Sequence, residues 1–242
     1  MNRLALAGVV LASLSLSIAA WFVGTGIRNK GQVKTVRVTG LAEKNFTSDL
    51  IVWRGSFNKL NMNLKDAYQE LKQDESKIRA YLQSKGVKDE AVVFSAVDIN
   101  SEYNYTYHAG ENHREFLGYR LTQSVKVEST DVAGIETISR EVTELIDQGV
   151  ELSSQSPEYY YTKLAELKLD LIRKATEDAK QRAGEIAKAA GAGLCDLRKA
   201  DMGIFQITGL HSSEEFSWGG AFNTDSKEKT ARITVNLLYD LK

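Results

Sequence analysis

Apolar and polar positions divide the chain into an uncharged N-terminal run and a longer body in which strand-like and helix-like patterns alternate. Residues 4–27 (LALAGVVLASLSLSIAAWFVGTGI) contain no charged side chain, whereas Arg3 precedes them and Arg28 and Lys30 follow. At a rise of about 1.5 Å per residue, a helix of this length covers about 36 Å, more than a hydrocarbon core of about 30 Å. The run predicts one N-terminal transmembrane helix.

A cleaved secretory signal peptide is the alternative interpretation of this run. Residues 4–16 make an acceptable apolar region, and residues 17–19 (Ser-Ile-Ala) resemble a cleavage site. Against cleavage, the apolar run continues through Trp21 and Phe22, two side chains that suit a membrane interface. We therefore expect an uncleaved anchor, and either interpretation sends the remaining chain across a membrane.

The body of the chain, residues 31–242, is expected to form one domain after the anchor or signal segment at residues 1–30, because no shift in composition divides it. Its centre follows the order strand, helix, strand, strand, helix, strand, which is the split βαβ order of ferredoxin-like units. Alternating apolar side chains predict the strands, at residues 48–60, 91–107, 115–129 and 150–161. Apolar side chains at helical spacing predict the helices, from 63 to 85 and from the Thr130/Asp131 cap to Gly149.

Local signals refine this centre. Gly55 marks a β-bulge, and the polar residues 108–114 form the tip of a long hairpin. Gly86 ends the first helix in a left-handed conformation. Pro157 indicates that the last strand lies at a sheet edge or contains a kink.

The rest of the body consists of a first strand, a long helix and two final strands, at residues 35–42, 164–190, 197–207 and 229–241. The long helix carries an alanine at every fourth position, at Ala175, Ala179, Ala183 and Ala187. This ridge of methyl groups lets the helix approach a sheet or another helix closely, and the chain's own sheet is the expected neighbour. The Ser- and Gly-rich residues 208–226 join the last two strands.

Composition excludes several classes of protein. With 43% hydrophobic and 26% charged residues, the chain is too apolar to be disordered, and its one Cys rules out an internal disulfide or a cysteine zinc cluster. The 31 basic and 32 acidic residues include no basic cluster that would follow a phosphate backbone, so no nucleic-acid partner is expected. The sequence contains no GxGxxG, Walker or GxSxG pattern, and we assign no catalytic, cofactor-binding or metal-binding residue.

Two groups of side chains are candidates for chemistry in spite of this. His108 and His113 share the hairpin tip with Glu111 and Glu115, but their spacing matches no metal site, so a solvated turn is expected. Cys195 is the only thiol, and the leucines around it favour a small buried residue over a redox sensor.

Three tyrosines form a further candidate. Tyr103, Tyr105 and Tyr107 alternate along one strand and therefore lie on one face of it. A stacking platform for bases or sugars would need Lys or Arg beside the rings, and none is near in the sequence of that strand. We expect these rings to pack against a helix or a partner subunit.

Several segments carry a resemblance to a known family. They read VRVTGLAEKNFTSDLIVWRGSF, FLGYRLTQSVKVEST and KATEDAKQRAGEIAKAAGAGL followed by ADMGIFQI, and they resemble the SIMPL-domain family over nearly the whole chain after residue 34. The most specific parts are the alanine helix and the opening V-x-V-x-G-x-A-E, at Val36, Val38, Gly40, Ala42 and Glu43. At the helix exit the chain has Leu194-Cys195, where relatives commonly have Leu-Gly.

Combined with the element order, the resemblance implies a SIMPL-type α+β fold: a ferredoxin-like βαββαβ core, a long C-terminal helix and two further strands, preceded by the transmembrane helix. The family includes bacterial periplasmic proteins linked to oxidative-stress defence, and the resemblance implies assembly into homo-oligomers, which look ring- or channel-like in some cases. No catalytic residues are established for the family. We therefore expect a non-enzymatic protein of the inner (cytoplasmic) membrane that self-assembles, with its C-terminal domain in the periplasm. The alanine ridge and the hairpin are the surfaces expected to pack closely. The alternatives are a periplasmic protein released by signal cleavage, an envelope ligand-binding module and, less favoured, a hydrolase.

Overall fold

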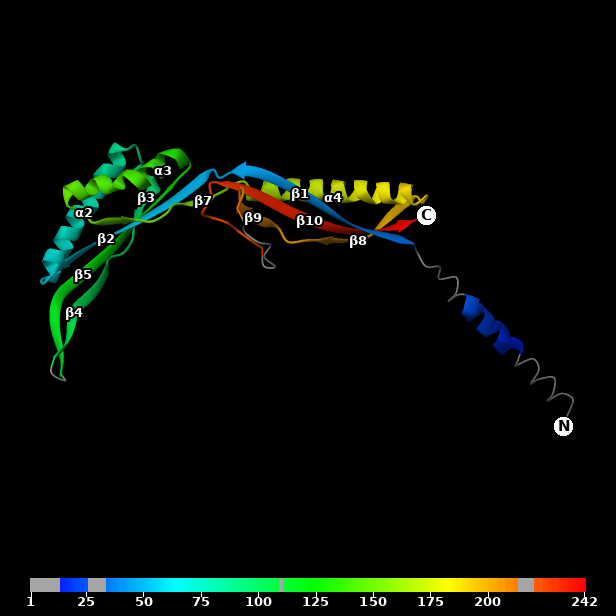
Figure 1. Cartoon of the computed structure of the whole chain (residues 1–242), viewed down its shortest axis with the longest axis horizontal. Coiled ribbons are helices and arrows are strands. Elements are labelled where there is room, and N and C mark those ends of the chain that lie inside the picture. The colour runs from blue at the N-terminus through cyan, green and yellow to red at the C-terminus, as the bar shows by residue number, and fades with distance from the viewer. Residues whose placement is uncertain (1–13, 26–33, 109–110, 213–219) are drawn as a thin grey trace. The chain divides into compact units, whose positions relative to one another are not determined.

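The computed structural model describes residues 14–25, 34–108, 111–212 and 220–242, and the chain forms two compact units (Figure 1). The terminal unit combines the chain up to Ala42 with Ile172–Gly203 and Thr234–Lys242, and the central unit combines Glu43–Leu171 with Ile204–Ile233. Three elements supply residues to both units, namely β1 (Thr35–Thr47), α4 (Leu164–Ala189) and β10 (Glu228–Leu241).

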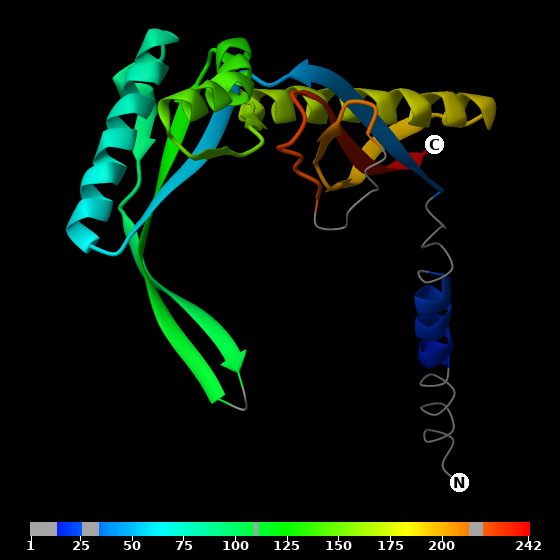
Figure 2. The same ribbon diagram turned by 60° about the vertical axis from the view of Figure 1, so that its left-hand side comes forward.

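The central unit contains a six-stranded antiparallel sheet, with helices α2 and α3 packed on one face (Figures 1 and 2). Its elements are β2 (Leu50–Asn61), α2 (Leu64–Ser84), η1 (Asp89–Ala91), β3 (Val92–Phe94), β4 (Asp98–His108), β5 (Glu111–Ser129), α3 (Val132–Glu141), η2 (Val142–Gln148), β6 (Leu152–Ser154) and β7 (Glu158–Tyr160). Strand β2 pairs with β5 on one side and with β6 and β7 on the other, while β3 and β4 pair with the far edge of β5. The predicted α+β fold class is confirmed, and this strand order is that of the split βαβ unit.

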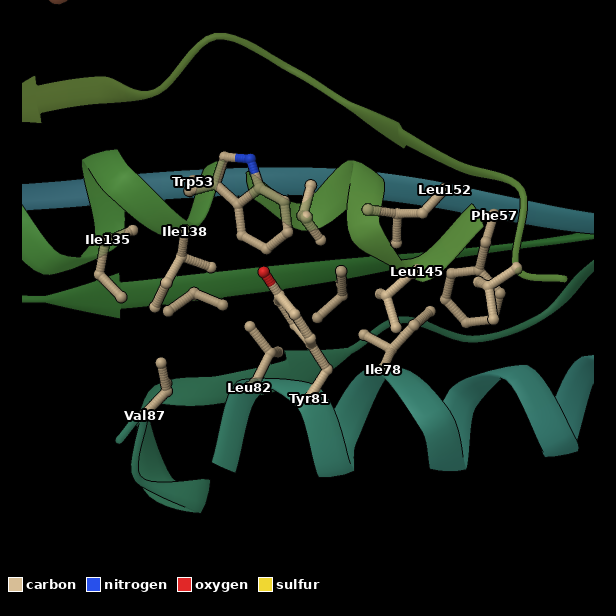
Figure 3. Close-up of a cluster of buried hydrophobic side chains, with 14 of the residues drawn as sticks. Trp53, Phe57, Ile78, Tyr81, Leu82, Val87, Ile135, Ile138, Leu145 and Leu152 are labelled. Carbon is tan, nitrogen blue, oxygen red and sulfur yellow. The ribbon is translucent and has the colours of Figure 1, made fainter. Parts of the chain in front are cut away.

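The core of the central unit lies between the sheet and the two helices (Figure 3). Trp53 and Phe57 of β2 and Ile78 of α2 are fully buried there. The indole N–H of Trp53 donates a hydrogen bond to Ser154 Oγ at 2.9 Å, and that hydroxyl donates to the carbonyl oxygen of Ser139 at 2.7 Å. The polar atom of this fully buried core side chain therefore has a hydrogen-bond partner, as is usual for buried polar groups.

The helices of this core begin and end where the sequence predicts. The side chains of Asn63 and Asp131 cap α2 and α3 by accepting hydrogen bonds from backbone N–H groups of the first turn. Gly86 (φ 86°) follows α2 and Gly149 (φ 75°) follows η2, both in the left-handed conformation. The second predicted helix differs in one respect, because its last seven residues, Val142–Gln148, form a 3₁₀ helix.

The β-bulge predicted at Gly55 is wrong. Strand β2 pairs with β5 without a shift of register from Ile51 to Asn61. The shift lies instead in the β4–β5 ladder, where Glu102 pairs with Gly118 and the next residue of β4 pairs with Phe116. One residue of β5, Leu117, is therefore left over, and the bulge belongs to the hairpin.

The hairpin also differs from its prediction at both ends. The single strand predicted over 91–107 is broken between β3 and β4, because side chains replace the ladder there: the Gln123 amide donates to Ser95 O at 2.9 Å, and Ser124 N donates to Ser95 Oγ at 3.0 Å. At the other end the predicted loop 108–114 is too long, because β5 already begins at Glu111.

In the terminal unit, α4 packs on a sheet with the strand order β1–β10–β8, in which β8 (Leu194–Met202) is antiparallel to β10. The four alanines of the predicted ridge are at most 1% exposed, at Ala175, Ala179, Ala183 and Ala187. A β-carbon built on Gly40 of β1 would lie 2.7 Å from the β-carbon of Ala179, so the ridge faces the chain's own sheet.

The strand predicted over 197–207 is two strands. Strand β8 starts earlier, at Leu194, and ends at Met202, and β9 (Gln206–Gly209) pairs with β10 through its own register, opposite Lys229–Arg232. Both β8 and β9 pair with β10, so β10 is the strand that connects them into one sheet.

At the N-terminus, residues 14–25 are helical. Within the described residues, no helix has both the length and the apolar character needed to cross a membrane. The predicted transmembrane run, residues 4–27, falls partly outside what the structure describes, which leaves out residues 1–13 and 26–33.

Candidate interaction surface

The outer part of the β4–β5 hairpin is a two-stranded arm, which we define as residues 103–108 and 111–116. From Tyr119 to Ser129, strand β5 also pairs with β2, whereas the described residues of β5 before Tyr119 pair only with β4. In Figures 1 and 2 the arm extends away from the helices and from the rest of the sheet. Its two faces therefore lie outside the core of the central unit.

The bulge at the base of the arm requires glycine. Gly118 has a φ of 135°, and a β-carbon there would lie 2.6 Å from the carbonyl oxygen of Asn61. Next to it, the Arg120 guanidinium donates to Glu102 at 2.5 Å and to Asn58 Oδ1 at 2.7 Å. These contacts fix the point at which the arm leaves the sheet.

One face of the arm is aromatic. The guanidinium of Arg114 lies 3.5 Å from the ring centre of Tyr103 and 5.8 Å from that of Tyr105, its cross-strand partner. Phe116 packs against Tyr103 with the two rings tilted by 60° and their centres 5.3 Å apart. Tyr105 and Tyr107 are 68% and 72% exposed, although both carry large apolar rings. We call Tyr103, Tyr105, Tyr107, Arg114 and Phe116 the aromatic face.

The opposite face of the arm is polar. Asn104 pairs with Glu115 and Thr106 pairs with His113, and all four residues are exposed. His113 thus lies in a strand and not in a loop. Among the described residues no group of three or more His, Cys, Asp or Glu is placed to hold a metal ion, and the side chains of His108 and Glu111 lie outside that description.

Arg114 is the residue that sequence reasoning missed. It lies in the next strand of the hairpin and not in β4, and the register that places it opposite Tyr105 brings it over the rings. An Arg cation over an aromatic ring is favourable by about 0.5–2 kcal/mol, more when water is excluded. The arm therefore holds the combination of phenol rings and a cation that the sequence of β4 alone lacks.

A small polar pocket lies elsewhere in the central unit. It has a volume of about 250 Å³, and its lining includes Glu43, Gln206, His211 and Arg232. Arg232 forms an ion pair with Glu43, so the two strongest charges in the pocket neutralise each other. His211 lies in a turn with a φ of 59°.

The central unit also contains a buried lysine, Lys229. Lys229 is 2% exposed, and its Nζ donates to the carbonyl oxygens of Tyr159 at 2.5 Å and Asn223 at 2.6 Å. The hydroxyl of Tyr159 donates to Glu136 at 2.9 Å, and Lys227 pairs with the same carboxylate at 3.1 Å. Burial and the neighbouring Glu136 raise the pKa of Tyr159 to about 12.

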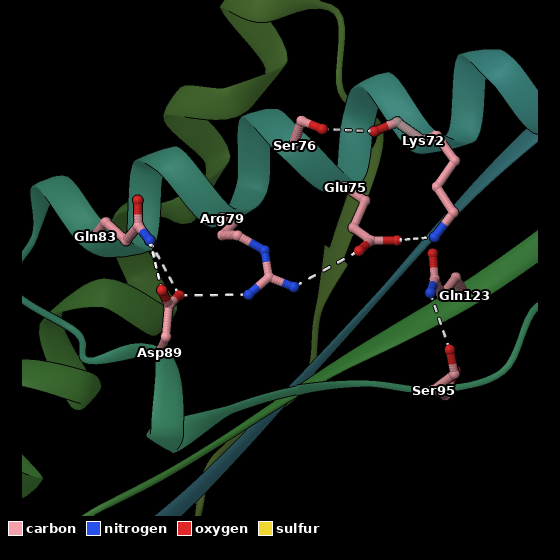
Figure 4. A network of polar contacts seen from close by, with 8 residues as sticks. All are labelled: Lys72, Glu75, Ser76, Arg79, Gln83, Asp89, Ser95 and Gln123. Atoms are coloured by element: carbon pink, nitrogen blue, oxygen red, sulfur yellow. Dashed lines mark hydrogen bonds and ion pairs between the residues drawn. The ribbon is translucent and has the colours of Figure 1, made fainter.

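A second polar network joins α2 to its neighbours (Figure 4). Glu75 lies 2.6 Å from Lys72 Nζ and 3.6 Å from the Arg79 guanidinium, which also pairs with Asp89 at 3.3 Å. Burial acts to raise the pKa of Glu75, but its hydrogen bond with Lys72 and the nearby cations outweigh this and hold that pKa below its usual value. Each charge has an opposite neighbour, which fits a structural role.

The buried position predicted for Cys195 is wrong. The thiol is free and exposed, because it lies on β8, a strand whose other residues are also exposed except for the half-buried Leu194. Of the two leucines that flank it, Leu194 is half-buried and Leu197 is 49% exposed, so they do not place Cys195 in a core.

Comparison with known families decides the relationship of this chain. The sequence profile of SIMPL, described as a protein of unknown function (DUF541), matches residues 36–236. The chain belongs to the SIMPL family. Among curated proteins, none matches the chain.

The structure explains the SIMPL opening sequence in physical terms. Val36, Val38 and Ala42 are buried and alternate with exposed residues along β1, so they form the face of the strand that meets α4. Gly40 lies on the same face, and the backbone of α4 leaves no room for a side chain there. The V-x-V-x-G-x-A pattern and the alanine ridge are therefore two halves of one close contact.

Proposed function

We propose that this SIMPL protein is a non-enzymatic, membrane-anchored exported protein that assembles with copies of itself through the aromatic face of its arm. The observation that carries the proposal is the exposure of Tyr105 and Tyr107 on a two-stranded arm outside the core. Neighbouring exposed rings mark interaction surfaces, and Tyr and Arg are enriched among the side chains that dominate binding energy. A second copy supplies the partner predicted for these rings.

The proposed anchor is supported by the sequence and by the helix at residues 14–25. Its apolar side chains have no core to enter: Leu16 is 72% exposed and Phe22 is 66% exposed. A lipid bilayer is a solvent in which such a surface is stable. The proposal places the anchor in the inner (cytoplasmic) membrane and residues 31–242 in the periplasm, where a link to oxidative-stress defence is the hypothesis that the family resemblance suggests.

The absence of enzymatic activity is part of the proposal and rests on the polar pocket. Glu43 and Arg232, which both line this pocket, form an ion pair with each other. A hydrolase would instead require an activated nucleophile next to a base, in a cleft with apolar walls.

An envelope ligand-binding module is the second candidate, and the position of Arg114 over Tyr103 favours it. A planar ring with a cation beside it is suited to stacking sugars or bases. Addition of cell-wall fragments to isotope-labelled protein separates the two functions: shifts confined to Tyr103–Tyr107 at constant particle mass favour ligand binding over assembly.

The particle mass tests the proposed function. In detergent, the full chain should form particles several times heavier than the 26.9 kDa monomer. A chain without residues 1–30 should remain assembled but lose membrane association, because the arm and the anchor are separate. A monomer at all micromolar concentrations would overturn assembly, and recovery of the full chain in the soluble fraction would overturn anchoring.

A further inference from the structure

The sequence contains one modification motif twice. Glu102-Tyr103-Asn104-Tyr105-Thr106 and Glu43-Lys44-Asn45-Phe46-Thr47 each have Asn followed two residues later by Thr and preceded two residues earlier by Glu. Asn-x-Thr is the acceptor pattern for N-linked oligosaccharides in exported proteins. An acidic residue two positions before the Asn is the further feature that bacterial oligosaccharyltransferases recognise.

The structure makes the motif at Asn45 a poor acceptor. Its side-chain oxygen accepts a hydrogen bond from Thr230 Oγ1 of β10 at 2.9 Å, and Glu43 is paired with Arg232 of the same strand. Strand β1 is paired with β10 in a sheet. Presenting Asn45 to an enzyme therefore requires removal of β1 from that sheet.

The motif at Asn104 lies in a different environment. Asn104 and Thr106 are exposed on the polar face of the arm, and neither side chain makes a hydrogen bond to any described residue. Strand β4 has β5 as its only partner here. Two-stranded hairpins are marginally stable, and segments with few buried contacts open locally at low free-energy cost. Glu102 lies at the base of the arm and is paired there with Arg120, so exposure of this carboxylate requires opening to extend past Glu102.

We propose that Asn104 is an acceptor site for an N-linked oligosaccharide, and that Asn45 is not. The donor class is an oligosaccharide linked to a lipid pyrophosphate. Asn104 Nδ2 attacks the anomeric carbon, the carbon–oxygen bond to the pyrophosphate breaks with its electron pair on that oxygen, and one amide proton leaves to a base. The proposal rests on the proposed export of the chain, because such donors face the periplasm.

The position of Asn104 gives the modification a consequence for the arm. Neighbouring residues of a strand point to opposite faces, so a glycan on Asn104 extends away from the side of Tyr103 and Tyr105. It leaves the aromatic face open and covers the polar face. The glycan thus restricts which side of the arm meets a partner.

The test uses the purified full chain in detergent, a purified bacterial oligosaccharyltransferase that recognises the acidic motif, and a lipid-pyrophosphate-linked oligosaccharide. Intact mass should show one glycan, which persists in Asn45→Gln and disappears in Asn104→Gln. Thr106→Ser should retain modification and Thr106→Val should reduce its rate at least tenfold, which separates recognition of the hydroxyl from a change in folding.

No modification of the purified chain overturns the proposal, and so does a glycan that persists in Asn104→Gln. Because the enzyme and donor are supplied directly, the result does not depend on whether the chain is exported. Export is scored separately, by the cellular fraction that contains the unmodified chain.

Discussion

Gly40 of β1 lies against Ala175 of α4 so closely that a β-carbon on Gly40 would be 2.0 Å from the Ala175 carbonyl oxygen. The obstructing atoms belong to the helix backbone, so no rotation of a side chain relieves the overlap. Strand β1 and helix α4 can lie this close together because the strand has a glycine at the contact and the helix has alanines. This contact connects the two most specific parts of the SIMPL pattern.

Gly40→Ala should therefore destabilise the protein by about 3 kcal/mol, at the upper end of the usual cost of overpacking. The free energy of unfolding in urea measures this. Gly184→Ala on α4 is the matched control, because nothing lies within 4 Å of the β-carbon it adds, and it should stabilise the helix by up to about 1 kcal/mol. Equal stabilities for the two variants would contradict the close contact.

The base of the arm should be equally intolerant of a side chain. Gly118→Ala meets the Asn61 carbonyl and a φ of 135°, so we expect it to cost about 2–3 kcal/mol and to move the arm. Gly86→Ala meets a left-handed φ in open space and should cost only about 1 kcal/mol. Urea unfolding compares the two, and amide chemical shifts of the arm should change in Gly118→Ala alone.

Lys229 should contribute more stability than its sequence neighbour Lys227. Lys229→Met leaves the carbonyl oxygens of Tyr159 and Asn223 without that donor, at a cost of about 1–3 kcal/mol. Lys227→Met removes a partly exposed ion pair with Glu136 and should cost less than about 1 kcal/mol. If Lys227→Met unfolds at a lower urea concentration than Lys229→Met, the expected contribution of the buried Lys229 is contradicted.

Stability should fall at alkaline pH because of Tyr159. An unfolded tyrosine ionises near pH 10, whereas burial and Glu136 raise the pKa of Tyr159 to about 12 in the folded protein. The unfolded state therefore loses this proton first, and folding stability decreases as pH rises from 10 to 12 by about 1.4 kcal/mol per pH unit at most. Tyr159→Phe should flatten this part of the pH profile relative to the unsubstituted protein; identical slopes would contradict the raised pKa.

Local signals in the sequence were sufficient to predict the helices and the order of the strands. The cap at Asp131 acts through its own side chain on the first helical turn, and Gly86 and Gly149 end their helices through their own backbone conformation. No distant contact was needed to identify them. The alanines of the ridge are spaced by one helical repeat, and that pattern is also local.

Features that depend on the exact register of a strand pair, or on the place of a strand in its sheet, were not predictable in the same way. The bulge lies at Leu117 because of the β4–β5 register, although Gly55 looked as suitable in the sequence. Arg114 joins the tyrosines only across that ladder, and the exposure of Cys195 follows from the place of β8 in its sheet. The division into two units was also not visible in the sequence. Because β1, α4 and β10 each contribute to both units, no change in composition marks a boundary between them.

Assembly through the aromatic face is tested most directly by the mass of the full chain in detergent, compared between two double variants of the arm. Tyr105→Ser/Tyr107→Ser changes the aromatic face, and Thr106→Ala/His113→Ala changes the polar face without altering the rings. We predict that the first falls to the monomer mass near 26.9 kDa while the second keeps the assembled mass of the unsubstituted chain. An aromatic-face variant that retains the assembled mass, with its thermal unfolding unchanged, would contradict the account.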